Sequence, residues 1–448
     1  MASSMNETGV SVFDDRPVGA LQWAALTICG FCMVVDGFDV QAMAYAAPAL
    51  LGAWHIDRTV LGPVFGAGLL GMLVGSLALA GVADRIGRRP ALIAATLWVA
   101  LLMAFTPSMH TVGQLIGGRF AAGIGMGVII PNAMALAGEY SPARMRATLM
   151  MAVSSGYVLG GVAGGAVASL VIARFGWGGV FHAGAILTAL LCLVMVCCLP
   201  ESLQFCLLRR PDQPRTRRLL SRVAPDARLP LMPDAPAVSE RQALSTLFTE
   251  GRARSTPILW AANFANMLCA YFLAAWIPVL MSDPTTTSGR AALAGTTLWL
   301  GGLAGNVLLG ALIDLRGFAA VLQMNFVVGG LAIAGLSLFY ASPREAMLLI
   351  ALAGFCVLGG QSGLNALAVS VYPTEVRATG AGWASGIGRL GAVVGPAAGG
   401  YLMAFGWSAD RTLLIAALPA AGAAAAIGML GRRRNSRFRR SESRRCPP

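Results

Sequence analysis

The sequence predicts an all-α membrane protein in which twelve transmembrane helices form two similar six-helix bundles. Three observations support this prediction. The 448-residue chain is 56% hydrophobic and only 12% charged, roughly half the charged fraction of an ordinary soluble domain. Twelve apolar segments are long enough to cross a bilayer, which takes about 18 residues or more. The last six segments repeat short motifs of the first six at a nearly constant offset.

The apolar segments fall into two groups of six, separated by a hydrophilic stretch rich in Arg and Pro. The first group covers residues 20–50, 59–83, 90–108, 112–138, 147–173 and 178–199. The second group covers residues 256–281, 291–313, 318–341, 346–371, 378–405 and 411–431. We therefore expect a tail at 1–19, a first bundle at 20–199, a linker at 200–255, a second bundle at 256–431 and a basic tail at 432–448.

The internal repeat is carried by short motifs with matching spacing. Asp84 and Asp314, 230 positions apart, follow the second and the eighth segment. The other matches are offset by 231: Pro142, Arg146, Ala147 and Thr148 recur as Pro373, Arg377, Ala378 and Thr379, and Gly160 and Gly164 recur as Gly391 and Gly395. Six-helix repeats of this kind describe a large class of secondary transporters.

The net charge of +13 comes from 33 arginines and no lysine. With both termini placed in the cytoplasm, 26 arginines lie in cytoplasmic segments and five in outer loops, as the positive-inside rule requires. The charge gathers in the linker and the C-terminal tail rather than on one folded face, so it favours contact with anionic lipid over nucleic acid. The nine cysteines show no metal-binding spacing.

Two acids stand within the first apolar segment. Asp36 and Asp39 are three positions apart, so on a helix they share one face. A carboxylate at bilayer depth costs a few kcal/mol, roughly, and is seldom present without a function. Because burial disfavours the charged form, such a carboxyl is suited to taking up and releasing a proton. The alternative is a polar packing pair at a helix end.

Two arginines also lie inside predicted spans, and the repeat gives neither a charged counterpart. Arg389 lies about three turns into the eleventh span, where a guanidinium can donate two hydrogen bonds to a carboxylate substrate. A structural ion pair is the alternative. Arg119 lies in GGRFAAGIGMG and pairs with Asp36 or Asp39, either as a releasable partner or as a fixed strut between helices. Glycines 123, 125 and 127 allow another helix to approach.

Three motifs now resemble those of a known family. GVADRIGRR at 81–89 resembles the signature between helices 2 and 3 of the major facilitator superfamily, and PES at 200–202 resembles that family's end of helix 6. DGFD at 36–39 is similar to the aromatic acid:proton symporter branch, which transports hydroxybenzoates, benzoate and gallate. Three positions depart from the pattern: Ala80 stands where the family has glycine, PESLQFC replaces PESPRWL, and Ala319 replaces a histidine common in close relatives.

The resemblance implies roles for particular residues. Arg377 and Arg389 have the twelve-residue spacing of two arginines in this branch, the second of which matters for transport. Asp84 is expected to gate the cytoplasmic side by holding the start of helix 11. The other expected members of the cytoplasmic network are Arg85, Arg88, Arg89, Glu139, Arg144, Arg146, Asp314, Glu375 and Arg377.

Uncharged polar residues on the seventh and tenth spans are candidates for the substrate cavity. The predicted lining residues are Asn263, Asn266, Tyr271, Gln361, Ser362 and Asn365, with Tyr45, Tyr157 or Trp299 as a stacking aromatic. Such side chains suit a hydroxylated ring. Ordinary hydrogen bonding between helices explains each of them equally well.

The combined interpretation is a monomeric transporter of a bacterial inner membrane that imports a small aromatic carboxylate with protons. The resemblance predicts no cofactor and no metal. There are two alternatives: an exporter of drugs or metabolites with the same fold, or a symporter for another organic anion. The sequence contains no nucleophile–base pair, metal cluster or cofactor motif, so we expect no enzyme activity.

Overall fold

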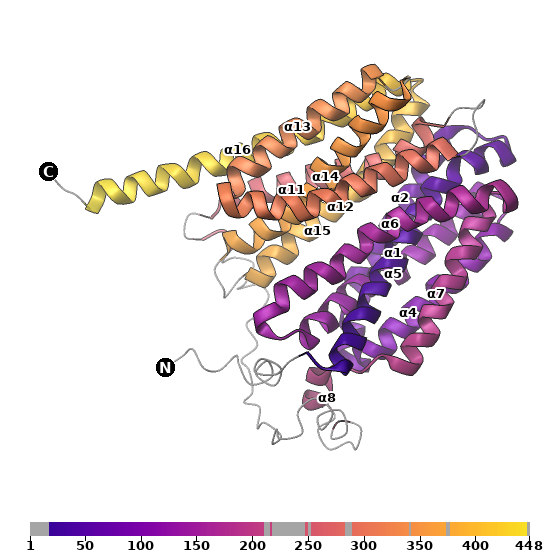
Figure 1. Cartoon of the computed structure of the whole chain (residues 1–448), viewed down its shortest axis with the longest axis horizontal. Coiled ribbons are helices and arrows are strands. Elements are labelled where there is room, and N and C mark those ends of the chain that lie inside the picture. The colour runs from indigo at the N-terminus through magenta and orange to yellow at the C-terminus, as the bar shows by residue number, and fades with distance from the viewer. Residues whose placement is uncertain are drawn as a thin grey trace. The chain divides into compact units, whose positions relative to one another are not determined.

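The computed structural model describes residues 18–209, 216, 247–249, 252–282, 289–339, 342–372 and 377–445. Contacts between residues divide the chain into two compact units: residues 1–46 with 67–236, and residues 47–66 with 237–448. The second unit therefore includes the end of the first predicted span and the start of the second. Figure 1 colours the helices from indigo at the start of the chain to yellow at its end.

Before residue 210, six long helices are joined or followed by short helices and turns. In chain order, the long and short helices are α1 (Ala20–Trp54), η2 (Arg58–Val60), α2 (Leu61–Ala78), α3 (Ala80–Ile86), α4 (Arg88–Phe105), η3 (Thr106–Ser108), α5 (Val112–Tyr140), η4 (Ala143–Met145), α6 (Arg146–Phe175), α7 (Gly178–Cys198) and α8 (Leu203–Arg209). Their ends follow ordinary capping chemistry. Thr111 Oγ1 accepts a hydrogen bond from the backbone N–H of Gln114, and Gln114 Oε1 accepts one from the backbone N–H of Thr111. This capping box starts α5.

Glycines bring the helices of the first unit into backbone contact. A Cβ on Gly71 or Gly75 of α2 would lie 2.1 Å from a backbone oxygen of α5. A Cβ on Gly160 of α6 would lie equally close to the oxygen of Val34 on α1. Gly123 and Gly127 face α2 from α5, while Gly125 faces α4. The glycines predicted to admit a neighbouring helix therefore do so on two faces of α5.

The second unit repeats this packing with its own helices. These are α11 (Ser255–Leu280), α12 (Gly289–Arg316), α13 (Phe318–Phe339), α14 (Pro343–Val371), α15 (Arg377–Ala404) and α16 (Ala409–Arg445). Gly391 and Gly395 of α15 pack on the backbone of α11, as Gly160 of α6 packs on α1. Gly301 and Gly305 of α12 pack on α14, as Gly71 and Gly75 pack on α5. The sequence repeat thus corresponds to equivalent contacts between helices in the two units.

All twelve predicted spans are helical. In the described part of the chain, eleven helices are long and apolar enough to cross a membrane by length and composition. The twelfth, α15, has the length but is rich in glycine and carries Arg389, so it falls below that hydropathy. Most predicted boundaries differ from the helix ends by one to four residues, and the span at 59–83 is divided into α2 and α3 at Leu79. Ser255 rather than 256 begins α11, and α16 continues to Arg445 because arginine is a good helix former.

Candidate functional site

The first unit buries an ion pair between α1 and α5. Arg119 Nη1 lies 2.9 Å from Asp39 Oδ1, and Arg119 Nη2 donates to the backbone oxygen of Asp39 at 3.2 Å. Asp39 is fully buried and Arg119 is 4% exposed. The predicted partnership of Arg119 is therefore with Asp39. Two donors on one residue hold the guanidinium in a fixed orientation.

The second acid of α1 lies one turn before this pair. Asp36 is 1% exposed, so both acids of the DGFD motif are enclosed by protein. Oδ2 of Asp39 accepts no hydrogen bond from any residue that the structure describes. One oxygen of this buried carboxylate is therefore paired with Arg119, and the other is without a donor among the described residues.

Close helix packing encloses the two acids. Between them, Gly37 lies against the backbone oxygen of Tyr157 on α6. A Cβ on Gly68 of α2 would lie 3.8 Å from the guanidinium of Arg119. Six residues after Asp39 on α1, the Tyr45 hydroxyl donates to the backbone oxygen of Gly161 at 2.9 Å. Helix α6 thus packs closely on α1 between the two acids in sequence, and α2 lies close to the guanidinium of Arg119.

The second unit joins four predicted polar residues in one amide network. Gln361 Nε2 on α14 donates to Asn263 Oδ1 on α11 at 3.1 Å and to Asn365 Oδ1 at 3.0 Å. Asn266 Nδ2 donates to Gln361 Oε1 at 2.8 Å and to the backbone oxygen of Val357 at 3.1 Å. The network runs from fully buried Asn266 to exposed Asn365. Beside it, Ser362 bonds to Asn306 of α12.

The orientation of the Asn266 amide is set by its partners. The backbone oxygen of Val357 only accepts hydrogen bonds, so the nitrogen of Asn266 must face it. The amide oxygen then points elsewhere, and no described residue donates to Asn266 Oδ1 although the side chain is fully buried. An unsatisfied buried acceptor costs about 1–3 kcal/mol. It therefore marks a position where a donor from water or a ligand would be stabilising.

Arg389 lies on α15 directly after a glycine that packs on α11. The preceding residue, Gly388, packs on Asn263. A Cβ built on Gly388 would lie 3.6 Å from the backbone oxygen of Asn263. Arg389 is half-buried. Among the described residues its guanidinium forms no ion pair and no hydrogen bond, so the structure gives no support to a structural ion pair. Its donors are available to an anion.

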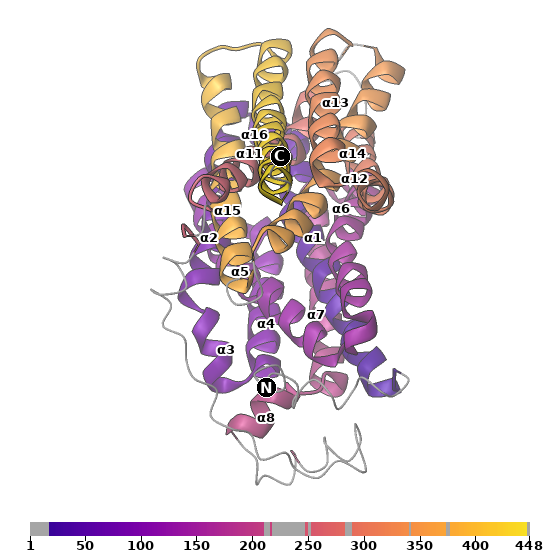
Figure 2. The same cartoon turned by 90° about the vertical axis from the view of Figure 1, so that its left-hand side faces the viewer.

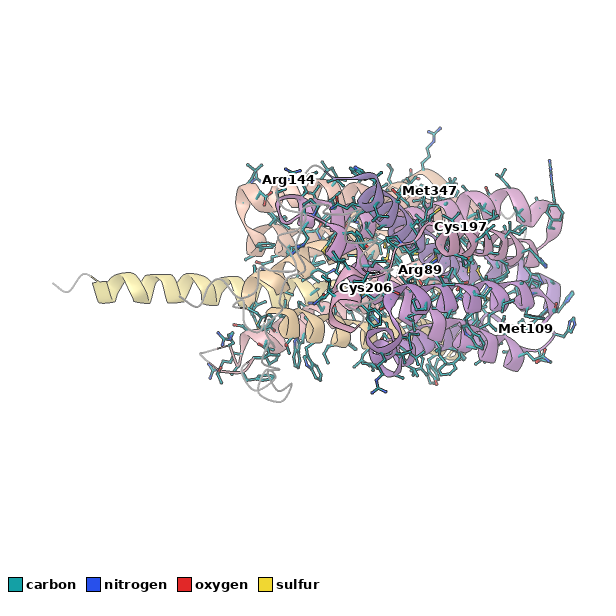
Figure 3. The ribbon with its side chains drawn as sticks, turned by 90° about the horizontal axis from the view of Figure 1, so that it is seen from below. Arg89, Met109, Arg144, Cys197, Cys206 and Met347 are labelled. Carbon is teal, nitrogen blue, oxygen red and sulfur yellow. The ribbon has the colours of Figure 1, made fainter. Side chains whose placement is uncertain are left out.

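A second polar cluster joins the predicted signature loop to the PES motif at one end of the first unit. Arg88 pairs with Glu139, whose other oxygen accepts from the Ser202 hydroxyl at 2.6 Å. Glu201 Oε1 accepts the backbone N–H of Arg89 at 3.0 Å. Figure 2 shows α8, which follows PES, at the end where α3 and α4 meet. Figure 3 labels Arg89 at this end and Met109 beyond the other end of α4.

Gly87 sets the geometry of this cluster. Its φ of 108° suits glycine, and a Cβ there would lie 2.5 Å from Glu201 Oε2. On the other side, the Tyr140 hydroxyl donates to the backbone oxygen of Glu201 at 2.7 Å. The loop, α5 and the end of α7 are therefore tied together by Glu201 and Glu139.

The sequence interpretation missed the importance of Glu201, Ser202 and Tyr140. PES was noted only for its resemblance to the family's end of helix 6. In the structure, Glu201 accepts a hydrogen bond from the signature loop and Ser202 donates one to Glu139 of α5. The signal was present, because an acid and a hydroxyl at the end of a span opposite several arginines predict such a cluster.

Other predicted site residues are not joined to these clusters. Arg85 and Asp314 are exposed and make no hydrogen bond or ion pair with the described residues. Arg146 reaches only the backbone oxygen of Ser141, at 3.4 Å. Tyr271 is half-buried on α11. Glu375 lies outside the described residues. Asp84 and Arg377 lie in described helices, but their side chains are outside the description.

The fold and these clusters define a class of protein. The described part of the chain holds twelve long helices in two units with matching contacts, an ion pair buried in one and an amide network in the other. This arrangement defines a multi-pass membrane transport protein. Within the described residues, no group of three His, Cys, Asp or Glu side chains is placed to hold a metal ion.

Sequence comparison identifies the family. The sequence model of the Major Facilitator Superfamily matches residues 29–396 and, separately, residues 259–445. The chain therefore belongs to the Major Facilitator Superfamily, which confirms the family predicted from its motifs and indicates a transporter rather than an enzyme.

Several characterised transporters are similar over most of their length. The chain is 34% identical over 420 residues to the 4-hydroxybenzoate transporter PcaK of Pseudomonas aeruginosa, covering 93% of this chain and 94% of that protein. It is 33% identical over 418 residues to a gallate transporter of Pseudomonas putida, covering 92% and 93%. It is 29% identical over 422 residues to a benzoate transport protein of Acinetobacter baylyi, covering 91% and 89%.

Proposed function

We propose that this protein imports a small aromatic carboxylate of the hydroxybenzoate or benzoate class together with protons. The names of the similar transporters support the substrate class. The single observation that carries the coupling is the buried Asp39–Arg119 pair with Asp36 one turn away. Acids enclosed in a membrane helix bundle mark proton pathways in transporters.

The coupling step follows from the geometry of the pair. A proton arriving at Asp39 weakens its attraction for Arg119, since a neutral carboxyl pairs poorly with a guanidinium. Asp36 offers a second position one turn along the same face, so a proton can pass between the two carboxyls. The conformation that closes around the site then depends on whether these acids carry charge.

Arg389 is the proposed anchor for the substrate carboxylate. Its guanidinium is without a protein partner among the described residues and stays charged at any physiological pH. The network of Asn263, Gln361 and Asn365 supplies donors and acceptors for the rest of the ring. Arg119, Asn266 and Tyr271 complete the proposed substrate-binding set.

The clusters at the ends of the spans are proposed to gate the pathway. The pair between Arg88 and Glu139 and the bond between Glu201 and Arg89 fix the signature loop on the first unit. We assign Asp84, Arg85, Arg146, Asp314, Glu375 and Arg377 to the same function. We propose that this side and both termini face the cytoplasm, which the arginine distribution supports. The protein is proposed to be a monomer in a bacterial inner membrane.

Uptake of labelled substrate tests the proposal. Cells expressing the protein are expected to accumulate 4-hydroxybenzoate, protocatechuate, gallate or benzoate, and a protonophore should abolish accumulation. Asp39→Asn should lose accumulation driven by a pH gradient. Asp57→Asn is the matched control, because Asp57 is an exposed cap of η2 and asparagine caps equally well.

Two results would contradict the proposal. If none of the four acids enters faster than in cells without the protein, the substrate class is wrong. If Asp39→Asn still concentrates substrate against its gradient when a pH difference is imposed, Asp39 does not couple proton entry to transport.

A further inference from the structure

Two adjoining hollows open at one end of the second unit. One has a volume of about 300 Å³ and the other of about 650 Å³. They share Phe318, Ala319 and Gly431, so they form one continuous recess beside α13 and α16. Volumes of roughly 300–1,000 Å³ are typical of sites for small molecules. Of the residues that line this recess, Asp314 is assigned above to the gate, and none is assigned to proton coupling or substrate binding.

The recess lies where the apolar spans end. Ser255 and Phe318 begin the spans of α11 and α13, and Gly431 ends the apolar span of α16. Val371 ends α14, three residues after its span. All four line the recess. A ligand held there therefore meets both the hydrocarbon and the polar layer of a bilayer.

Small residues open the recess and apolar ones line its interior. A Cβ on Gly431 would lie 2.8 Å from that of Ala319, so the two helices almost touch at this point. Gly317 turns the chain between α12 and α13 with φ of 82°. The wall of the smaller hollow is formed by Leu367, Ile427 and Leu430. An acyl chain finds a continuous apolar surface here.

The charge around the recess is positive. Arg252 is half-buried in the wall of the smaller hollow, and exposed Arg316 lines the larger one. Asp314 is the acid among the lining residues. The sequence continues directly from Gly431 into Arg432, Arg433 and Arg434 on the same helix. Figure 1 shows α16 extending beyond the other helices of its unit at this end.

We propose that this recess binds an anionic phospholipid. The phosphate pairs with Arg252 and Arg316, and one acyl chain lies along Leu367, Ile427 and Leu430. Basic recesses between membrane helices on the cytoplasmic side favour such headgroups. A soluble anion would gain nothing from the apolar wall, and a zwitterionic lipid would gain less from the arginines.

Thermal unfolding of the full-length protein in detergent tests this site. Added dioctanoyl phosphatidylglycerol should raise the unfolding temperature in a saturable manner, since a ligand that binds only the folded state stabilises it. Dioctanoyl phosphatidylcholine and inorganic phosphate should not. The double variant Arg252→Gln/Arg316→Gln should need roughly thirtyfold more phosphatidylglycerol for the same rise in unfolding temperature. This factor follows from a loss of about 1 kcal/mol of binding free energy per arginine.

The matched control changes two arginines at the opposite ends of helices in the same unit. Arg344→Gln/Arg411→Gln removes two exposed charges from the starts of α14 and α16 and should respond as the wild type does. An unaltered response of the Arg252/Arg316 variant, or an equal effect of inorganic phosphate or phosphatidylcholine, would overturn the proposal.

If the variant does not fold, the salt dependence of the lipid effect on the wild type still tests the proposal. Because the headgroup pairs with partly exposed arginines, salt should weaken the effect of phosphatidylglycerol as the Debye length falls below about 10 Å. A response that is independent of salt would show that the lipid binds by its chains alone, and the charge recognition proposed here would be wrong.

Discussion

At the scale of single residues, the pair of Asp39 and Arg119 determines which changes the first unit tolerates. Arg119→Leu strands a buried carboxylate, and this should cost about 3–5 kcal/mol of folding stability. The double variant Asp39→Asn/Arg119→Leu removes both charges and should recover a large part of that loss. Unfolding in detergent measures both. Equal stability of the single and the double variant would show that the pair contributes no coupling.

The bare oxygen of Asn266 predicts substrate preference. If a ring hydroxyl donates to Asn266 Oδ1, Asn266→Leu should reduce uptake of 4-hydroxybenzoate far more than uptake of benzoate, because the hydroxyl then faces an apolar group. The ratio of the two initial uptake rates is the measurement, and it should fall at least tenfold, which is about 1.4 kcal/mol.

The control for Asn266 lies in the same unit. Asn325 is also buried and donates to a backbone oxygen of α14, at Cys356. Asn325→Leu should lower stability without changing the uptake ratio. If both variants leave the ratio unchanged, the unpaired oxygen of Asn266 holds water and does not contact substrate.

At the scale of helices, glycine contacts determine how closely the elements pack. A Cβ on Gly123 would lie 2.1 Å from the oxygen of Gly68, so Gly123→Ala must push α5 away from α2. Overpacking of this kind costs about 1–3 kcal/mol. Gly117→Ala on the same helix meets nothing within 4 Å and should leave stability unchanged or slightly higher. A comparison of unfolding midpoints checks the pair.

Two turn glycines at equivalent positions of the repeat allow the cost of backbone strain to be distinguished from the cost of a steric contact. Gly87 and Gly317 both have positive φ, but only at Gly87 does the added Cβ meet a side chain, that of Glu201. Both alanine variants should lose about 1 kcal/mol from strain. Gly87→Ala should lose more, because Glu201 must release the backbone N–H of Arg89. Equal losses would mean that Glu201 moves without cost.

The elements themselves were largely predictable from the sequence. A bilayer requires long apolar helices, so hydropathy placed all twelve spans within a few residues. The repeat motifs also predicted equivalent positions, since Gly160 and Gly391 pack on the first helix of their respective halves. Helix α16 ran past its predicted end because hydropathy detects where the membrane ends, whereas the helix continues as long as its residues favour it.

The partners within the sites were less predictable. Helical spacing placed Asp36 and Asp39 on one face, but it could not say which of them meets Arg119, because this depends on the rotation of α5 against α1. The same limit applies to Gln361, whose three amide partners come from two helices. An acid opposite several arginines indicated that Glu201 belongs to a cluster, but its bond to the backbone N–H of Arg89 could not be read from the sequence.

At the scale of the whole molecule, the two units share a packing plan and differ in polar content. Gly71 and Gly301 make equivalent contacts, yet Asp39 and Arg119 have no charged counterparts in the second half. A repeated scaffold with unrepeated charges suits a carrier in which the proton-coupling acids belong to one unit and the proposed substrate-binding residues, apart from Arg119, belong to the other. This division of tasks predicts that the two functions can be separated by mutation.

Arg389→Gln should therefore weaken substrate binding without removing the response to protons. Its expected signature is a raised KM, because a lost carboxylate contact costs binding energy. Asp39→Asn should instead retain exchange of labelled for unlabelled substrate while losing net accumulation. If the arginine variant loses its pH response, or the aspartate variant loses exchange as well, the tasks are not divided between the units.

The driving force gives a quantitative test of the whole cycle. In vesicles with the membrane voltage held at zero, one pH unit is worth about 1.4 kcal/mol per proton, so each coupled proton allows tenfold accumulation of the substrate anion. The logarithm of the accumulation ratio should rise linearly with the pH difference, and its slope gives the number of protons. If more than one proton enters with a monovalent anion, net charge moves, and an imposed voltage should add about 2.3 kcal/mol per charge for each 100 mV. A ratio that stays at one across all pH differences would show that the buried acids of α1 do not couple transport to protons.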